Sequence, residues 1–484
     1  MRTHRSARLA AVLALLVLWP GLPPAPARAQ ALTRKAPSLI YPGAATEMQL
    51  VWQLAATESS LVEWSDPTTS RRGRAWTHEY GTDHQHTYTV TGLVPGRRYA
   101  YRVTAGTETH TGSFRAAPEA GASTLKFMAY GDTRSYPLVH DEVAAAMMAT
   151  VAADEEFHTF TLVVGDLVSD GDSESAWTSE FFDPSYTHIR ELMGNLPYHS
   201  AMGNHEGSGS LFVKYFPYPF VGGRYWSFDY GPAHFVVVDQ YSDYGPGSAQ
   251  LAWIEQDLAA TAQPWRFLYL HEPGWSAGGH ENNAVVQTYL QPLCEEHGVS
   301  VIFAGHNHYY ARAVVNGIQH VTTGGGGAPL KPPEGGYPNV VDTAMVHHHC
   351  RVEIDGGYLH FTAVTPGDSV IDAFDLALSG AGAAPPEGGC AHSGLWLGTA
   401  APNPSGRAVT IPYSLARAAA ARLTVYDVRG QRVAVLLDET LPEGPRSAHW
   451  NGRDASGNEV SAGIYFLRLD TAQASCTTKL TLRK

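Results

Sequence analysis

The stretch "LKFMAYGDTR" at residues 125–134 contains the pattern that decides the fold of this chain. An apolar run typical of a buried strand ends there at Asp132, whose carboxylate is a good metal ligand. Four more apolar runs end in metal-capable residues, namely Asp166 in "FTLVVGD", Asn204 in "PYHSAMGNH", His271 in "RFLYLH" and His306 in "VSVIFAGHNH". In open α/β sheets, ligands bind at the carboxyl ends of the strands. The five endings therefore predict one polar site at one sheet edge.

Helix-like stretches lie between these runs, at residues 141–154 and 283–298. Strands that alternate with helices indicate an α/β architecture, so we predict a central α/β sandwich over residues 125–376. Residues 36–118 contain runs such as "MQLVWQL" and "RRYAYRVTAG", in which apolar and polar residues alternate. This alternation predicts an N-terminal β-sandwich, and the fold class is multidomain.

A stretch rich in Gly, Ala and Pro predicts a linker over residues 378–399, and the β-like runs of residues 400–484 predict a small C-terminal β-sandwich. The last segment resembles the C-terminal sorting domain of proteins exported by the bacterial type IX secretion system. The sequences "PNP" and "WNGRDASGNEVSAGIYF" and the terminal lysine carry this resemblance. It implies the type IX secretion machinery as a partner, and an ordinary immunoglobulin-like accessory domain is the alternative.

The chain has 484 residues and a formal net charge of -13, from 33 basic and 46 acidic residues. Nucleic acids and anionic membranes attract clustered positive charge, so this balance argues against both as partners. Residues 1–29 have the basic start, apolar run and small-x-small ending of a signal peptide, with an uncleaved membrane anchor as the alternative. We expect a secreted or cell-surface protein with no integral membrane segment in the mature chain.

The motifs that carry chemistry occur in the order "YGDTR", "VVGDLVSDG", "GNHE", "YLHEP" and "GHNHYYAR". Carboxylates and imidazoles of this kind can hold two metal ions that clamp a phosphoryl group. The order resembles the calcineurin-like metallophosphoesterases, and the purple acid phosphatases among them, over about residues 36–376. This resemblance implies a metallophosphoesterase catalytic domain at residues 125–376. The segment "LVPGRRYAYRV" before it resembles a fibronectin type III domain.

The resemblance also implies a site for two divalent or trivalent metal ions, and residues of this type accept Fe, Zn or Mn alike. Asp166 would bridge both ions. The first metal would also be bound by Asp132 and His308, and the second by Asn204, His271 and His306. The implied metal ligands are thus Asp132, Asp166, Asn204, His271, His306 and His308. His205 would lie beside the leaving group, and Glu206 would orient it. The last motif extends in the family's manner to Tyr310 and Arg312.

Two positions depart from the family pattern. Ser169 stands where the purple enzymes have a tyrosine ligand, so a purple iron–tyrosinate colour is not expected. Arg134 stands where other members have a histidine, so the first metal loses its usual fourth ligand, which water or His140 could replace. Arg134 could hold substrate phosphate through its guanidinium, or it could form a structural ion pair.

We therefore predict a hydrolase of small phosphate esters that resembles the acid phosphatases and acts on monoesters. Metal-bound hydroxide would attack phosphorus, and the metals and Arg134 would stabilise charge on the phosphoryl oxygens. His205 would protonate the leaving oxygen. A phosphodiesterase or nucleotidase with the same ligands is one alternative, and a surface binding protein with a degenerate site is another. Two further segments, His347–His349 and "GGGGAP" at 324–329, are expected to be a strand and a tight turn.

Overall fold

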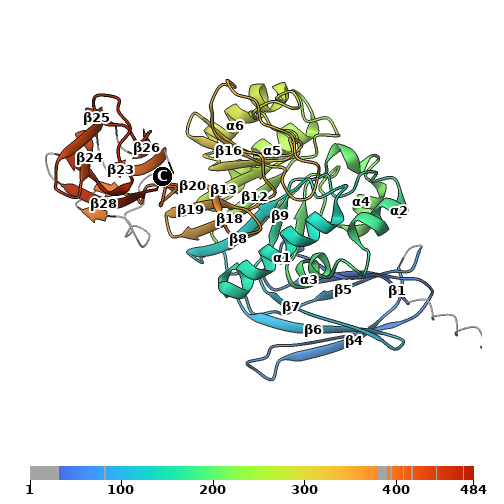
Figure 1. Cartoon of the computed structure of the whole chain (residues 1–484). Helices are drawn as coiled ribbons and strands as arrows, with labels where there is room; N and C mark the ends of the chain where they lie inside the picture. The colour runs from blue at the N-terminus through green and yellow to red at the C-terminus, as the bar shows by residue number, and fades with distance from the viewer. Residues whose placement is uncertain are drawn as a thin grey trace, which may run out of the picture.

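The computed structural model describes residues 32–80, 83–378, 390–392, 395–406, 408–415, 418–442, 444–471 and 474–483. The predicted signal peptide at residues 1–29 lies outside the described residues. Three regions follow one another along the chain, each built on two β-sheets (Figure 1). In the part of the chain that the structure describes, no helix is both long and apolar enough to cross a membrane.

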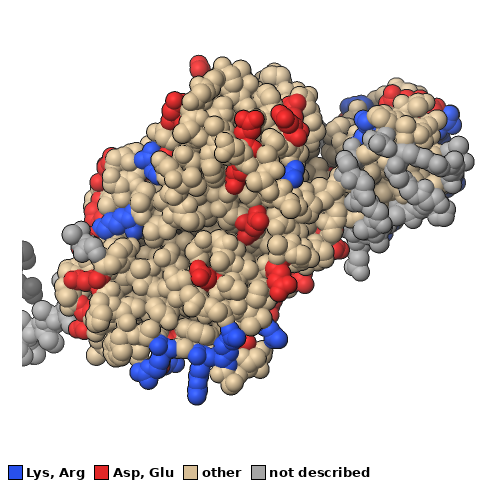
Figure 2. Space-filling view, turned by 180° about the vertical axis from the view of Figure 1, so that it is seen from behind, with Lys and Arg blue, Asp and Glu red and all other residues tan. Residues whose placement is uncertain are grey.

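The N-terminal region consists of antiparallel strands in two sheets, ordered β1-β2-β5 and β4-β3-β6-β7. Alternate side chains of β6, among them Tyr99 and Val103, are buried because successive residues of a strand face opposite sides. They share one apolar core with Leu50 and Trp52 of the other sheet. In Figure 2, basic side chains gather at the edge of this region. The strands are β1 (Thr33–Ile40), β2 (Met48–Leu54), β3 (Ser60–Ser65), β4 (Arg72–Thr77), β5 (Gln85–Val90), β6 (Arg98–Ala105) and β7 (Glu108–Arg115).

Two mixed sheets form the central region, ordered β10-β9-β8-β18-β19-β20 and β11-β12-β13-β14-β16-β15-β17. Parallel pairs join β8, β9 and β10 in the first sheet, and β12, β13, β14 and β16 in the second. The strands of the first sheet are β8 (Thr124–Tyr130), β9 (Thr161–Val163), β10 (Tyr198–Ser200), β18 (His349–Asp355), β19 (Tyr358–Val364) and β20 (Val370–Ala377). Those of the second are β11 (Trp226–Tyr230), β12 (Ala233–Val237), β13 (Trp265–Tyr269), β14 (Val301–Ala304), β15 (Tyr310–Val315), β16 (Ile318–Thr323) and β17 (Val340–Ala344).

Helices connect the parallel strands of both sheets. Helix α1 (Pro137–Ala153) follows β8 and begins at a proline, whose missing N–H is not needed in the first turn. Helix α5 (Ala249–Ala260) follows β12, and Ser248 caps it by accepting a hydrogen bond from the Leu251 amide. The other helices are α2 (Glu174–Ala176), α3 (Thr187–Asn195), α4 (Ser210–Tyr215) and α6 (Gln291–Glu296), with π-helical turns at Trp177–Phe181 and Val286–Leu290 and 3-10 turns at Glu155–Phe157 and Asn204–Glu206.

Phenylalanine rings and one ion pair join the two central sheets. Phe127 of β8 meets Phe267 of β13 edge to face, with 5.4 Å between ring centroids. Such aromatic pairs combine large buried area with a favourable geometry. Arg312 of β15 lies with its Nε 2.6 Å from a carboxylate oxygen of Asp372 on β20. The core and the ion pair fix the sheets relative to each other, and with them the strand ends.

The C-terminal region has two antiparallel sheets, ordered β21-β22-β23-β26 and β25-β24-β27-β28, and lies beside β19 and β20 (Figure 1). The predicted linker at 378–399 extends too far, because Leu395 and Leu397 are buried in the core of this region and their strand pairs with β23. Residues 379–389 of that range lie outside the described residues. The strands are β21 (Cys390–His392), β22 (Leu395–Leu397), β23 (Val409–Leu415), β24 (Ala419–Asp427), β25 (Arg432–Leu441), β26 (Gly444–Trp450), β27 (Gly463–Thr471) and β28 (Ser475–Leu482).

Candidate metal centre

The residues predicted from the strand endings lie just beyond the carboxyl ends of β8, β9, β10, β13 and β14. Three of them, Asp132, Asp166 and His306, have a left-handed backbone with φ of 54°, 56° and 67°. This conformation is uncommon for residues other than glycine, and strained residues of this kind cluster at functional sites. A Cβ at Gly305 would lie 2.3 Å from the Asp132 carboxylate, so only glycine fits beside this site. The glycine before His306 is therefore a packing requirement of the site.

Glu206 anchors the loop that carries Asp166. Its fully buried carboxylate accepts hydrogen bonds from the backbone amides of Asp166 at 3.0 Å, Leu167 at 2.7 Å and Gly203 at 2.6 Å. Burial, and then the Asp166 carboxylate, raise the pKa of Glu206. The sequence predicts that Glu206 orients His205. The hydrogen bonds of its carboxylate instead come from the backbone around Asp166, because three buried amides there need an acceptor.

Three of the predicted ligands surround an imidazole nitrogen of a fourth, His271. The Nδ1 of His271 donates to the Val164 carbonyl at 2.7 Å, so a neutral ring presents the lone pair of Nε2 to the site. Asn204 Oδ1, Asp166 Oδ1 and His306 Nδ1 lie 3.1, 3.3 and 3.2 Å from this Nε2. Ligand atoms around one tetrahedral ion are about 3.3 Å apart when the bonds are about 2.0 Å long. We call these four residues, Asp166, Asn204, His271 and His306, the second site.

The pKa shifts of His306 and His271 describe how positive charge is distributed in the second site. Burial, followed by the nearby His271 and His280, lowers the pKa of His306 to about 3, so its ring is neutral and its lone pair is available. Burial alone would lower the pKa of His271, but the Asp166 carboxylate raises it to about 10. Without a metal, the pocket therefore stabilises a proton on His271 where a metal ion would otherwise lie. The donor set and its electrostatics fit a metal ion.

The remaining predicted ligands, Asp132 and His308, form a first cluster with Asp166. One ligand atom from each lies within 4.8 Å of the other two. His308 donates from Nδ1 to the Pro329 carbonyl at 2.8 Å, which leaves the Nε2 lone pair facing the cluster. However, Arg134 lies in the cluster, with its Nε 3.2 Å from Asp166 Oδ2 and its Nη2 3.3 Å from His308 Nε2. Two of the three cluster residues, Asp166 and His308, are therefore already hydrogen bonded to a cation.

His205 lies beside Asp166, and its side chain is 30% exposed. Its Nδ1 donates to the Ser169 carbonyl at 2.7 Å, and its Nε2 lies 3.9 Å from Asp166 Oδ2. The carbonyl fixes the ring so that Nε2 points to the cluster. A histidine held in this way can exchange a proton with a group bound at Asp166.

Residues that the sequence analysis missed also contribute to the site. The ring of His280 lies over that of His306, with 4.0 Å between centroids, and Lys331 Nζ lies 3.2 Å from His280 Nε2. Gln240 Oε1 accepts from the His271 backbone amide at 2.9 Å and so supports that ligand. These residues come from loops without a regular apolar pattern. For His280, the sequence signal was the polar composition of the loop after His271.

His140, the protein residue suggested as a replacement ligand, and Ser169, at the family's tyrosine position, both have other contacts in the structure. His140 is buried and its Nε2 bonds to the Tyr130 hydroxyl at 2.9 Å, so it packs in the core beneath the sheet edge. Ser169 Oγ donates to Glu180, whose carboxylate also accepts from the Ser169 and Ser135 amides at 2.9 Å each. Ser169 therefore belongs to a hydrogen-bonded turn with Glu180.

Several conspicuous motifs have structural roles. Tyr310 and Arg312 both donate to Asp372, at 2.7 and 2.6 Å, inside the joint between the central sheets. His348 is buried and its Nε2 bonds to Thr323 Oγ1 at 3.1 Å, so it does not join the site. The glycine-rich turn at 324–329 packs under the first motif, since the Gly326 amide donates to the Gly131 carbonyl at 2.8 Å.

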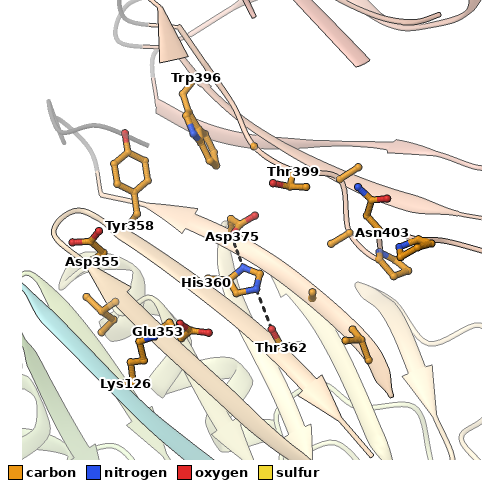
Figure 3. Close-up of a pocket in the computed structure, with 18 of the residues that line it drawn as sticks. Lys126, Glu353, Asp355, Tyr358, His360, Thr362, Asp375, Trp396, Thr399 and Asn403 are labelled. Atoms are coloured by element: carbon orange, nitrogen blue, oxygen red, sulfur yellow. Dashed lines mark hydrogen bonds and ion pairs between the residues drawn. The ribbon is translucent and has the colours of Figure 1, made fainter. Parts of the chain in front are cut away.

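A cavity of about 950 Å³ lies between the central and C-terminal regions (Figure 3). Lys126, Glu353 and His360 line its central side, and Trp396 and Asn403 line the other. Lys126 stands near the start of β8, whereas the predicted metal ligand of that strand follows its end. This cavity is therefore at the opposite end of the strand from the metal centre.

Comparison with known proteins agrees with this geometry. Residues 125–310 match the calcineurin-like phosphoesterase family, and residues 402–475 match the FlgD Ig-like domain. Purple acid phosphatase 18 of Arabidopsis thaliana is 28% identical over 166 residues, which cover 29% of this chain and 38% of that protein. Probable inactive purple acid phosphatase 27 of the same plant is 25% identical over 308 residues, covering 51% and 49%.

A solved structure shares the fold. The purple acid phosphatase PPD1 from yellow lupin (Lupinus luteus) seeds superimposes with a TM-score of 0.58 and 19% identity, covering 72% of this chain and 75% of that one. The matches to the two Arabidopsis proteins span less than half the length of each. The sequence match, the fold and the Asp132, Asp166 and His308 cluster point the same way. The central region of this chain therefore matches the calcineurin-like metallophosphoesterases over residues 125–310, and the similar proteins include purple acid phosphatases.

Proposed function

We propose that this protein is a metal-dependent hydrolase of small phosphate esters, an acid phosphatase-like phosphomonoesterase. The observation that carries the proposal is the group of acceptor atoms at 3.1–3.3 Å around His271 Nε2. Acceptors gathered in this way repel one another unless a cation lies among them. The calcineurin-like family match of residues 125–310 supports phosphate esters as the substrate class.

Asp166, Asn204, His271 and His306 would hold the metal ion, and Fe, Zn and Mn suit this mixture of oxygen and nitrogen donors. An ion bound there supplies Lewis acidity toward a phosphoryl oxygen and toward water. The sequence also predicts a first metal ion, held by Asp132, Asp166 and His308. That ion requires Arg134 to leave its contacts with Asp166 and His308.

The proposed metal chemistry predicts a colourless iron form. Ser169 provides no tyrosinate, and its hydroxyl donates to Glu180. Iron-loaded protein should therefore lack the visible charge-transfer band of an iron–tyrosinate bond. An absorbance spectrum of the loaded protein checks this, and a purple band that persists after removal of unbound iron would contradict it.

Two side chains of this chain would act on the substrate directly. His205 would donate a proton from Nε2 to the leaving oxygen, while Ser169 O holds its Nδ1 at 2.7 Å. Arg134 would bind phosphoryl oxygens, since a guanidinium matches phosphate in a bidentate manner. Its side chain is 16% exposed, so part of it remains open to a ligand.

The substrate class is tested by turnover of p-nitrophenyl phosphate and bis-p-nitrophenyl phosphate on purified protein loaded with Zn, Mn or Fe. Faster turnover of the monoester, abolished in Asp166→Asn, is the expected result. Faster turnover of the diester would favour a phosphodiesterase or nucleotidase that uses the same ligands.

A surface binding protein with a degenerate site is the second candidate function. Two observations favour it: Arg134 contacts two of the first-cluster ligands, and some relatives are named probable inactive purple acid phosphatases. Metal bound in the second site without turnover of either ester would support it. Turnover that depends on Asp166 would exclude it.

We further propose the domain roles that the sequence predicts. Residues 36–118 would be a fibronectin type III-like scaffold, 125–376 the catalytic domain, and 400–484 a type IX sorting domain on a secreted or cell-surface protein. The FlgD Ig-like match of residues 402–475 supports an immunoglobulin-like domain there and leaves the sorting role to experiment. Deletion of 400–484 should retain the protein inside a cell that has a type IX system. Unchanged export would contradict the sorting role.

A further inference from the structure

We infer that the guanidinium of Arg134 takes the place of the first metal ion, so that the centre binds one metal ion per chain, in the second site. This inference rests on the proposed function and concerns how the same site is built. Arg134 contacts both Asp166 Oδ2 and His308 Nε2, which are the atoms that a first ion would need.

The hydrogen-bond directions show that the ligand lone pairs are already in use. Because His308 donates from Nδ1 to the Pro329 carbonyl, its Nε2 can only accept, and Arg134 Nη2 donates to it at 3.3 Å. Arg134 Nε donates in the same way to Asp166 Oδ2 at 3.2 Å. With N–H bonds of about 1 Å, these hydrogens lie about 2.2–2.3 Å from their acceptors. Metal–ligand bonds to such atoms are about 2.0–2.2 Å long, so the hydrogens occupy the positions of an ion.

Charge leads to the same conclusion. Asp132 and Asp166 are buried carboxylates that need a positive partner, and an arginine remains charged at every accessible pH. The guanidinium supplies that partner to Asp166 permanently. A metal ion in the same cluster would add positive charge directly beside it, and the two cations would repel.

The surrounding loop holds Arg134 in this position. Its backbone amide donates to the Asp166 carbonyl at 3.2 Å, and its Nη1 donates to Ser135 Oγ at 3.2 Å. Glu180 then accepts from the amides of Ser135 and Ser169 and from the Ser169 hydroxyl. A tyrosine at 169 has no such small hydroxyl to offer Glu180. Hydrogen bonds thus connect Arg134 through Ser135 to Glu180 and Ser169. This network stands where a full set of metal ligands would otherwise lie.

The same contacts leave a phosphate-binding edge. A guanidinium has five N–H donors, and Nε, Nη1 and Nη2 each use one here. One donor remains on each Nη atom, and such a pair can bind two oxygens of a phosphoryl group. Arg134 would then neutralise the ligand cluster and hold the substrate at the same time.

Metal content tests the inference without reference to turnover. Protein stripped with a chelator is loaded with excess Mn²⁺, passed through a desalting column, and measured by elemental analysis and electron paramagnetic resonance. We expect one Mn²⁺ per chain with the six-line spectrum of an isolated ion. The variant Arg134→His, which restores an Asp-x-His sequence, should bind two Mn²⁺ with a spin-coupled spectrum, and Arg134→Lys should still bind one.

The outcomes separate this inference from the proposed function. Two Mn²⁺ in the unaltered protein would overturn the inference and leave the proposed function standing, and that count does not depend on any variant folding. One Mn²⁺ in an Arg134→His protein with unchanged circular dichroism and melting temperature would also overturn it. No bound metal in the unaltered protein, together with no hydrolysis, would overturn both.

Discussion

Replacing Arg312 by methionine should destabilise the central domain by about 3–5 kcal/mol, the usual cost of leaving a buried charge without its partner. The side chains of Arg312 and Asp372 are 4% and 3% exposed. The carboxylate accepts from Arg312 Nε at 2.6 Å, Arg312 Nη2 at 3.2 Å and the Tyr310 hydroxyl at 2.7 Å. Methionine removes two of these three donors and leaves a carboxylate in the core. At roughly 2–4 °C per kcal/mol for a domain of this size, the melting temperature should fall by about 6–20 °C.

Thermal and urea unfolding of the full chain measure this change, with Arg422→Met as the matched control. The Arg422 and Asp438 side chains are 53% and 54% exposed, so that substitution should cost about 0–1 kcal/mol. The double variant Arg312→Met/Asp372→Leu should recover most of the loss, because no unpaired charge remains. A loss below about 1 kcal/mol in Arg312→Met, or normal stability with lost turnover, would refute a structural role for this pair.

Three further predictions concern the site and the pH dependence of stability. His205→Ala should lower kcat by about 100-fold or more for alkyl phosphates and far less for p-nitrophenyl phosphate, because the alcohol is the poorer leaving group and needs the proton. An equal loss for both substrates would exclude the acid role. With one metal ion supplied per chain, Arg134→Ala should raise KM several-fold, and unchanged KM and kcat would rule out phosphate binding by this residue. Burial alone would lower the pKa of His234, but Asp229 and Asp257 raise it from 6.5 to about 9. The protonated His234 therefore contributes fully to the stability of the fold below pH 6.5, and this contribution is lost as the pH rises to 9. The free energy of unfolding should therefore fall more between pH 6 and pH 9 in the unaltered protein than in His234→Gln. Equal falls in the two proteins would contradict this assignment.

Much of the central fold could be predicted from the sequence, because its parallel strands are short apolar runs that end in polar residues. The strands β9 and β10 have three residues each, yet their endings at Asp166 and Asn204 were recognisable from the glycine and the polar residue that follow. The left-handed backbone at Asp166 and the close packing at Gly165 explain why a glycine and an aspartate stand at the end of this strand. Such local requirements leave a signal in the sequence.

The contacts among loops left no such signal. Arg134, Ser169 and Glu180 are brought together by the turn after β8 and the π-helical turn at Trp177–Phe181, and no periodicity relates them. The role of Glu206 was predicted from its neighbour His205, whereas its partners are backbone amides whose positions only the folded chain defines. Sequence patterns report burial and strand ends, but they do not report which donors face a given carboxylate.

The rate of p-nitrophenyl phosphate hydrolysis by chelator-stripped protein, measured while Mn²⁺, Zn²⁺ or Fe²⁺ is added back, tests the central claim most directly. The account predicts no turnover without metal, recovery that saturates with at least one of these ions, and no recovery in Asp166→Asn. The exposed Asp243→Asn variant, which makes the same chemical change outside the site, should recover like the unaltered protein. Turnover that persists without metal or in Asp166→Asn, or no turnover with any of the ions, would contradict the claim that this protein is a metal-dependent phosphoesterase.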